Sequence, residues 1–405
     1  MHRPGRKKKQ DASADEALHL PFDAAEFSTR LKYWYRKHAR VLPWRNITDA
    51  YGTWLSEIML QQTRVATVIE RYGEFLRRFP TIAALAEADE ADVLALWSGL
   101  GYYRRARMLH RGAQFVLREF GGELPRDSRT LRTLPGVGEY TAAAIASIAF
   151  RERIAVLDGN VERVLLRILG WPEDRSTRAL ASLNRVAQQL VPPPLTARAK
   201  GNPCGDHNQA MMELGATVCT PRAPLCLHCP VVDFCQTRGE HATAERKQQK
   251  SRTVAHLLAV RKRGTTTEVL LERRAKDASL MPDMMELPPL TLEAVADREP
   301  TMRLRHSITD TSYYVQIYTE SAPGAPPLRE EEEDEPDYMD EVVVATPEEI
   351  AEPVLLPQVA ASPESLHWVP LIRLPLQPLT GLARKALQRT GLMQVPRVRL
   401  EKLPQ

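Results

Sequence analysis

From Phe22 to about Arg238, apolar residues recur every three or four positions, which is the spacing of a helix face. Proline and glycine interrupt this pattern at Pro43, Pro80, Gly121-Gly122, Pro172 and residues 192–194. The clearest apolar stripe runs from Tyr51 to Arg78, and one carboxylate, Glu57, lies among its apolar residues. The pattern predicts an all-α domain over residues 22–240.

The pattern changes after a charged linker at residues 241–252. Runs rich in β-branched and aromatic residues predict strands at residues 254–260, 268–271 and 312–318. A second domain is therefore expected at residues 253–395, with an α+β fold. Residues 321–341 within it are too acidic and repetitive to pack, so we expect a disordered loop there, and residues 396–405 are expected to form a tail.

The charge is divided unevenly along the chain. Residues 1–250 hold 37 of the 55 Lys and Arg residues but only 27 of the 51 Asp and Glu residues, so this part is positive and the remainder negative. A basic part suggests a polyanionic partner, although many soluble domains are mildly basic. The basic residues 1–21 predict a flexible tail, with nonspecific contact to nucleic acid as the alternative.

Hydrophobicity and cysteine usage indicate the compartment. No apolar run approaches the ~20 residues of a membrane span, and no apolar segment follows the basic N-terminus. Four of the five cysteines are grouped, which is typical of a metal site in a reducing compartment and not of disulfides. We therefore expect a soluble, unexported protein of the cytoplasm, in which the separate Cys204 is an ordinary thiol.

The grouped cysteines follow the spacing C-x6-C-x2-C-x5-C and are Cys219, Cys226, Cys229 and Cys235. Four thiolates on one compact loop suit either a [4Fe-4S] cluster or a zinc ion. A zinc knuckle usually has two C-x2-C pairs, and only one is present here. The spacing therefore favours iron and sulfur and leaves zinc open.

A glycine-containing segment, LPGVGEYT at residues 134–141, precedes an Ala-rich helical run. Gly136 and Gly138 permit a tight turn, and the N-terminus of the following helix presents free N–H groups, which together suit a phosphate. A plain turn between helices is the alternative. Asp158 follows in the sequence VLDGNV, where capping the next helix is its alternative role.

The LPGVGEYT segment, the VLDGNV segment and the four-cysteine loop together resemble the helix-hairpin-helix DNA glycosylases of the endonuclease III type. Residues 42–45 (LPWR), 54–63 (WLSEIMLQQT) and 97–103 (WSGLGYY) resemble the adenine DNA glycosylases of the MutY family, and the similarity covers about residues 25–240. The resemblance implies an all-α helix-hairpin-helix domain whose four cysteines hold a [4Fe-4S] cluster. It also implies a base excision repair enzyme that flips adenine out of duplex DNA and removes it.

Cleavage of an N-glycosidic bond calls for a carboxylate beside the sugar and an acid at the leaving base, because the transition state is oxocarbenium-like. Asp158 suits the first role. Glu57 suits the second, since desolvation on an apolar helix face favours its protonated form, although a buried ion pair is the alternative. The resemblance implies the same assignment: Glu57 protonates adenine and Asp158 stabilises the sugar cation.

The resemblance implies further site residues. Those that assist at the sugar are Tyr140 and Asn160. Those that form the adenine pocket are Trp44, Arg45, Leu60 and Gln209. Those that contact the DNA backbone or the opposite strand are Gln62, Thr63, Leu100, Tyr102, Gly136, Val137 and Gly138, with Tyr102 as an intercalating wedge.

Tyr140 also predicts how the reaction ends. In endonuclease III-like enzymes a lysine stands at this position and forms a Schiff base that leads to strand cleavage. A tyrosine cannot form a Schiff base. The sequence therefore predicts a monofunctional glycosylase that uses water as the final nucleophile.

Residues 253–395 weakly resemble the Nudix-like domain with which MutY proteins recognise 8-oxoguanine opposite adenine. The resemblance lies in residues 285–288 (MELP) and 304–308 (LRHSI). The acidic run at residues 329–335 lacks the order of a Nudix hydrolase signature, so we do not expect nucleotide hydrolysis. The resemblance implies a monomeric enzyme whose substrate is duplex DNA with adenine opposite 8-oxoguanine or guanine.

The candidates for contact with the oxidised guanine are Arg305, His306 and Ser307. His306 corresponds to the family histidine, and its alternative is a surface residue without a role. Two neighbours depart from the family pattern: Leu304 replaces an aromatic residue and would keep an apolar wedge, whereas Arg305 replaces a serine and would contact either a base or a phosphate.

Two other functions fit parts of the sequence. The first is an endonuclease III-type glycosylase and lyase for oxidised pyrimidines, against which Tyr140 and the second domain argue. The second is a noncatalytic iron-sulfur protein that binds DNA, such as a redox sensor. Glu57 and Asp158 argue against it, because a pure binder has no need of both carboxylates.

Overall fold

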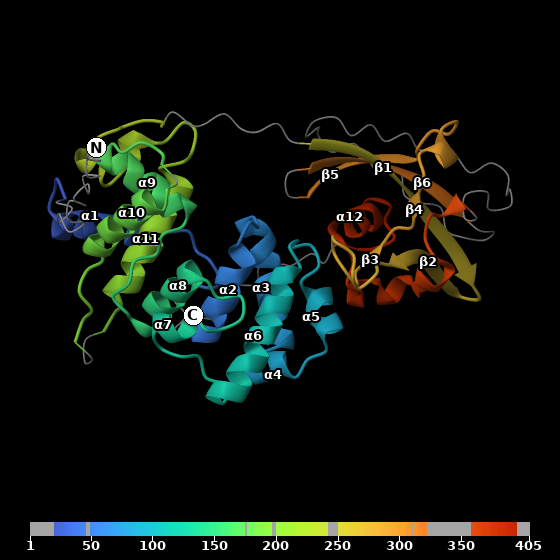
Figure 1. Cartoon of the computed structure of the whole chain (residues 1–405), viewed down its shortest axis with the longest axis horizontal. Coiled ribbons are helices and arrows are strands. Elements are labelled where there is room, and N and C mark those ends of the chain that lie inside the picture. Colours follow the sequence, from blue (N-terminus) through green and yellow to red (C-terminus); the bar gives the residue numbers. More distant parts are fainter. Residues whose placement is uncertain are drawn as a thin grey trace, which may run out of the picture. The chain divides into compact units, whose positions relative to one another are not determined.

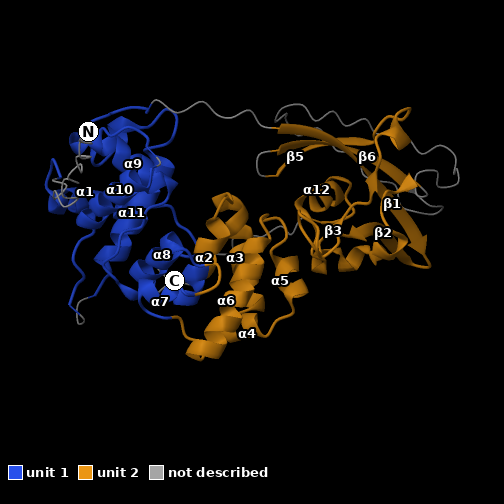
Figure 2. Ribbon diagram, in the orientation of Figure 1, with its two compact units in different colours: residues 1–54, 125–133, 137–244 blue, residues 55–124, 134–136, 245–405 orange. Residues whose placement is uncertain are grey.

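The computed structural model describes residues 20–45, 49–174, 176–196, 200–241, 250–308, 311–321 and 358–394. The chain divides into two compact units (Figure 2). Unit 1 comprises residues 1–54, 125–133 and 137–244, and unit 2 comprises residues 55–124, 134–136 and 245–405. The expected linker, acidic loop and terminal tails lie largely outside the described residues.

Unit 1 is helical (Figure 1). Its elements are α1 (Ala24–His38), α7 (Ser128–Leu131), α8 (Glu139–Phe150), α9 (Gly159–Leu169), α10 (Thr177–Leu190), α11 (Pro203–Thr217) and the 3-10 turns η1 (Cys226–His228) and η2 (Val232–Phe234). Polar side chains cap several helix N-termini by accepting backbone N–H groups, namely Asp23, Asp127, Asp158, Ser176 and Asn202. The apolar faces of α1, α9, α10 and α11 share one core.

Helix α2 (Ala50–Leu60) begins in unit 1 and ends in unit 2. The other helices before the sheet in unit 2 are α3 (Val65–Arg78), α4 (Ile82–Ala86), α5 (Glu90–Leu96) and α6 (Arg104–Phe120). Over residues 20–241, apart from the short undescribed gaps, the structure contains helices and no strand, which confirms the all-α prediction. Among the described residues, none of the helices has the length and hydrophobicity of a membrane span.

The apolar stripe at residues 51–78 belongs to two helices instead of one continuous face. Four residues separate α2 from α3, and Gln62 among them has a φ of +55°. The side chain of Arg105 binds the last carbonyl groups of α2, where further helical turns would otherwise supply N–H groups. The helix therefore ends in the middle of an apolar pattern that predicts its continuation.

The second half of unit 2 contains a mixed sheet. The described strands are β1 (Lys250–Arg263), β2 (Thr266–Arg273), β3 (Met285–Glu286), β4 (Pro289–Leu290), β5 (Met302–Ile308), β6 (Thr311–Ser321) and β7 (Leu366–Pro370). Their order is β3-β2-β1-β6-β5, with β4 paired to β1 and β7 paired to β2. Only the pairing of β1 with β6 is parallel among these described strands. The three predicted strands lie within β1, β2 and β6 and are confirmed.

Both faces of the sheet are covered. Helix α12 (Gly381–Arg389) lies against one face of the sheet (Figure 1). Its apolar side chains share one core with those of the strands and of the 3-10 turn η6 (Leu371–Leu376). The other face forms a smaller core to which the 3-10 turn η3 (Glu293–Val295) contributes, and a further short turn, η5 (Pro363–Ser365), precedes β7. Helix and mixed sheet together make this region α+β, as the sequence predicts.

The close contact of α9 with α11 gives a test of the fold. A Cβ on Gly215 in α11 would lie 2.7 Å from the Asn160 Cβ and 3.0 Å from the Asn160 carbonyl oxygen. A Cβ on Gly159 would meet nothing within 4 Å. We expect Gly215→Ala to lower the free energy of unfolding by about 1–3 kcal/mol relative to Gly159→Ala, because the backbone of α9 has to shift. Urea denaturation of both variants checks this, and equal stabilities would contradict it.

Candidate active site

Asp158 stands at the N-terminal cap of α9. Its Oδ1 accepts hydrogen bonds from the backbone N–H groups of Asn160 (3.0 Å) and Val161 (2.7 Å), and its Oδ2 accepts one from Asn160 Nδ2 (2.9 Å). The capping role considered as an alternative is therefore present. The same bonds fix both carboxylate oxygens at a helix N-terminus, where the dipole stabilises negative charge. A role at the sugar is compatible with this geometry and stays a prediction.

Arg163 ties this cap to two neighbouring segments. Its Nη2 donates to Asn160 Oδ1 (2.9 Å) and to the Gly215 carbonyl (2.7 Å), and its Nε donates to the Cys219 carbonyl (2.9 Å). Burial lowers the pKa of Arg163. One guanidinium thus connects the start of α9, the end of α11 and the first grouped cysteine.

The glycine hairpin leads from α7 into α8. Gly136 has a φ of +78°, and a Cβ there would lie 2.6 Å from the Met108 Cβ, so both backbone conformation and space require glycine. Gly138 is the N-cap residue of α8, and Val137 is buried. Tyr140 lies in the first turn of α8, where its hydroxyl is 3.5 Å from Met212 Sδ of α11.

Two of the expected pocket residues of unit 1, Arg45 and Gln209, lie at Tyr35. The guanidinium carbon of Arg45 lies 5.5 Å from the centre of the Tyr35 ring, and the Tyr35 hydroxyl donates to Gln209 Oε1 (3.1 Å). Trp44 is buried next to Arg45 in the turn after α1. The structure therefore brings Arg45 and Gln209, which are far apart in sequence, to one aromatic ring.

Glu213 is an acidic residue in this group that the sequence analysis missed. Its side chain is fully buried, its Oε2 accepts from Arg45 Nη2 (2.5 Å) and Arg40 Nη2 (2.8 Å), and its Oε1 accepts from Arg40 Nε (2.8 Å). Burial raises the pKa of Glu213, but the bonds from both arginines outweigh it and hold the pKa at about 2. The sequence pattern that could have identified Glu213 is the same as for Glu57: a single acidic residue between apolar residues of a helix, here Met212 and Leu214.

In unit 2, Glu57 lies in α2 and is 6% exposed, with Leu60 at the C-terminal end of the same helix. Arg105 in α6 joins this end to the loop before α6. Its Nη1 donates to the carbonyls of Ile58 and Met59 (both 2.9 Å), and also to that of Gln61.

The second terminal nitrogen of the Arg105 guanidinium binds Thr63 and the loop before α6. Its Nη2 donates to Thr63 Oγ1 (2.9 Å), to the Leu100 carbonyl (2.8 Å) and to the Gly101 carbonyl (3.0 Å). The guanidinium carbon also lies 5.6 Å from the centre of the Tyr102 ring. Burial lowers the pKa of Arg105 to about 10. The residues expected to meet the opposite strand are thereby held together.

Tyr102 is an exposed part of this arrangement. Its side chain is 43% exposed and its φ is +46°, an uncommon conformation for a residue other than glycine. An exposed aromatic ring on a fixed loop suits the expected wedge.

The candidates in the second domain lie on β5. Arg305 is exposed, its guanidinium carbon lies 5.8 Å from the centre of the Tyr314 ring, and its Nη2 is 3.4 Å from Ser312 Oγ. His306 is half-buried, and burial lowers its pKa. Ser307 is exposed, with its Oγ also 3.4 Å from Ser312 Oγ.

The expected apolar wedge at Leu304 is wrong. Leu304 is 3% exposed and belongs to the core that α12 covers. Because side chains alternate along a strand, Met302 and Leu304 point inward while Arg303 and Arg305 point outward.

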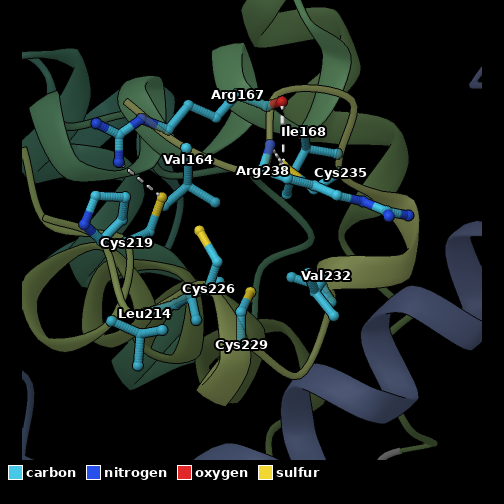
Figure 3. Close-up of a pocket in the computed structure, with 14 residues that line it drawn as sticks. Val164, Arg167, Ile168, Leu214, Cys219, Cys226, Cys229, Val232, Cys235 and Arg238 are labelled. Carbon is cyan, nitrogen blue, oxygen red and sulfur yellow. Dashed lines mark hydrogen bonds between the residues drawn. The ribbon is translucent and has the colours of Figure 1, made fainter. Parts of the chain in front are cut away.

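The four grouped cysteines line one pocket (Figure 3). The loop that carries them packs on α9 and α11, and Arg167 Nη1 lies 3.4 Å from Cys219 Sγ. The backbone N–H of Arg238 lies 3.4 Å from Cys235 Sγ. Cys204 lies outside this lining; it is buried, and its Sγ is 3.4 Å from the Pro192 carbonyl, as expected of an ordinary thiol.

The chemistry of the four thiols suits a metal centre, although their positions do not form a metal-binding group. Burial and the three neighbouring thiols raise the pKa of Cys229 to about 12, so four thiolates would need a cation among them. Within the described residues, no three Cys, His, Asp or Glu side chains form a group that could hold a metal ion. The suitability of the four cysteines for a metal rests on their shared pocket and on the chemistry of their thiols.

Residues 55–191 match the HhH-GPD family, described as a superfamily of base excision DNA repair proteins. The chain is 41% identical over 213 residues to the adenine DNA glycosylase of Mycobacterium tuberculosis (strain ATCC 25618 / H37Rv), an alignment that covers 52% of this chain and 67% of that protein. This chain belongs to the adenine DNA glycosylase family. It is also 50% identical over 224 residues to the Mus musculus adenine DNA glycosylase, covering 53% of this chain and only 42% of the mouse protein.

Among solved structures, a thermostable thymine-DNA glycosylase is similar with a TM-score of 0.48 and 28% identity, covering 53% of this chain and 96% of that one. Membership of the adenine glycosylase family rests on the sequence relatives. It confirms the resemblance to the adenine DNA glycosylases seen in the sequence.

The buried pair of Glu213 with Arg45 predicts a pH dependence. The folded pKa of Glu213, about 2, lies below the usual 4.5, so its stabilising contribution is present above pH 4.5 and is lost as the pH falls toward 2. Glu213→Gln should lower the free energy of unfolding by about 3–5 kcal/mol at neutral pH, because the charge of Arg45 loses its partner.

Urea denaturation across that pH range is the measurement. The difference between wild type and Glu213→Gln should shrink as the pH falls from 4.5 toward 2. Glu119→Gln is the control, since Glu119 forms an exposed pair with Arg118. A difference that does not change with pH would show that Glu213 is not held ionised by the arginines.

Proposed function

We propose that this chain is a monofunctional adenine DNA glycosylase of base excision repair, which flips out adenine mispaired with 8-oxoguanine or guanine and hydrolyses its bond to the sugar. The observation that carries the proposal is the retention of two carboxylates in the family motifs: Glu57 is buried in α2 and Asp158 is fixed at the cap of α9. The chain spans 42% of the length of its mouse relative and 67% of its mycobacterial relative, both named adenine DNA glycosylases.

The chemistry divides between the two acids. Glu57 donates a proton to the adenine ring, so that the base leaves as a neutral molecule. Asp158 stabilises the positive charge that develops on the sugar. Asn160 supports this role, because its donation to Asp158 Oδ2 keeps that carboxylate oriented. Tyr140 assists at the sugar without forming a covalent bond, so water completes the reaction.

DNA binding follows from the hairpin and the wedge. Gly136, Val137 and Gly138 bring backbone N–H groups to a phosphate at the start of α8. Tyr102 enters the base stack and offsets part of the unstacking cost of a few kcal/mol, while Gln62, Thr63 and Leu100 contact the opposite strand. The adenine pocket consists of Trp44, Arg45, Leu60 and Gln209.

The domain organisation completes the proposal. Residues 22–240 form the helix-hairpin-helix domain, and residues 253–395 form a Nudix-like domain that recognises 8-oxoguanine through Arg305, His306 and Ser307. Adenine is not a damaged base, so an enzyme that removes it safely must read its partner. We propose that the protein acts as a monomer in the cytoplasm.

The cofactor proposed for the cysteine pocket is a [4Fe-4S] cluster, held by Cys219, Cys226, Cys229 and Cys235. When bound, it would crosslink the loop through bonds between iron and the four cysteine thiolates. Two arginines of this chain position the cysteine loop: Arg167 donates to Cys219 Sγ, and Arg163 connects the Cys219 carbonyl to Asn160.

Single-turnover excision tests the function. A duplex with one adenine opposite 8-oxoguanine should give cleaved strands only after treatment with alkali, since a monofunctional glycosylase leaves an intact backbone. Glu57→Gln should bind this duplex and lower the excision rate at least about 100-fold, the contribution of a general acid. Glu70→Gln, on the exposed side of α3, is the control and should excise at the wild-type rate.

Strand breaks in the untreated half would instead support the lyase. The absence of product in both halves would support a noncatalytic DNA-binding protein. Wild-type excision by Glu57→Gln would remove the acid role from Glu57.

Removal of a cluster ligand tests the cofactor. Cys226→Ser should abolish the visible absorbance of the purified protein and lower its iron and sulfide content, whereas Cys204→Ser should keep both. A wild-type protein that contains zinc and no iron would overturn the cluster assignment.

A further inference from the structure

The first turn of α12 contacts two segments of unit 2 that the proposed function assigns to reading the strand opposite adenine. One is the loop of residues 98–103, which carries the wedge Tyr102. The other is the part of β5 that carries Arg305 and His306.

On the loop side, the contact is made by buried polar groups. The Leu379 carbonyl accepts hydrogen bonds from Ser98 Oγ (2.8 Å) and from the Tyr103 hydroxyl (2.6 Å), and Arg384 Nε donates to Ser98 Oγ (2.7 Å). All four residues are at least 93% buried. Ser98 and Tyr103 are the two ends of the loop, so both ends are anchored to the same carbonyl while Tyr102 between them is exposed.

On the β5 side, the contact depends on a glycine. A Cβ on Gly381 would lie 3.1 Å from His306 Cε1, so the histidine ring packs directly on the start of α12. Lys385 Nζ is 3.3 Å from the Arg305 carbonyl, one turn further along the helix. The helix start itself is fixed by Thr380, which donates to Glu286 Oε2 (2.6 Å) and caps Ala383 N–H (3.1 Å).

These contacts leave little freedom between the two segments. Burial lowers the pKa of Arg384 to about 10, so its charge is already costly to keep inside. Breaking its bond to Ser98 would leave a buried charge and a buried hydroxyl without that bond. A shift of α12 is therefore expected to move both ends of the loop.

We propose that Arg384 and Ser98 are positioning residues through which α12 couples base reading by β5 to insertion of the wedge Tyr102. Contact of His306 with the base opposite adenine biases the position of α12, and Arg384 and Leu379 transmit that bias to Ser98 and Tyr103. The coupling makes the excision rate depend on which base lies opposite adenine. This inference rests on the proposed function and explains how that site gains its selectivity for the base opposite adenine.

The test compares single-turnover excision of adenine opposite 8-oxoguanine with excision opposite guanine. Arg384→Met should lower the ratio of the two rates by about fivefold or more, the usual size of a coupling between sites. Arg373→Met is the matched control, because Arg373 is exposed in η6, and it should keep the wild-type ratio. Ser98→Ala removes only the hydroxyl and should lower the ratio in the same direction if Arg384→Met does not fold.

A double-mutant cycle with His306→Ala separates coupling from a general structural role. If α12 transmits the signal, the ratio in the double variant should equal that of the more affected single variant. Equal losses on both duplexes, or additive effects of the two substitutions, would overturn the inference and leave the proposed function intact. Failure of the wild-type protein to excise adenine from either duplex would instead overturn the proposed function.

Discussion

A single guanidinium, that of Arg105, holds together the segments on which the opposite-strand side of the proposed site depends. It binds carbonyls at the end of α2 with one nitrogen and carbonyls of the wedge loop with the other. Within the described part of the chain, no backbone N–H outside the helix donates to the Ile58 and Met59 carbonyls, and each would be costly to leave unpaired inside the protein. The end of the helix that carries Glu57 and the loop that carries Tyr102 therefore have a common anchor.

The same device, a buried charge satisfied by fixed partners, recurs in unit 1. Glu213 holds Arg40 and Arg45, and Arg163 binds carbonyls of α9, α11 and the cysteine loop. Such networks cost desolvation, and they are stable only while every member stays paired. Fixed dipoles and charges need no rearrangement when charge develops on a substrate, which is the property that an acid-assisted cleavage of a glycosidic bond requires.

Much of the fold could be predicted from local patterns, because helix and strand periodicity follow from which faces are buried. The strands at 254–260 and 312–318 are examples. The break between α2 and α3 could not be predicted, since it depends on Arg105 more than forty residues away. The burial of Leu304 required the register of β5, and Glu213 required its arginine partners. The sequence motifs identified the residues of the candidate site, whereas the contacts that hold these residues in place are visible only in the structure.

Two residues of this arrangement are held in strained backbone conformations. Gln62 and Tyr102 both have positive φ values, and a residue other than glycine in such a conformation costs of order 1–3 kcal/mol. That strain persists because Arg105 binds the Gln61 carbonyl before Gln62 and the Leu100 and Gly101 carbonyls before Tyr102. At Tyr102, the hydrogen bonds of Ser98 and Tyr103 to the Leu379 carbonyl, next to α12, add to this restraint. An undamaged adenine differs from its correct counterparts only in its partner, so selectivity has to come from a free-energy difference that the partner base can alter. A strained wedge, whose anchor also contacts His306, is an element of this kind.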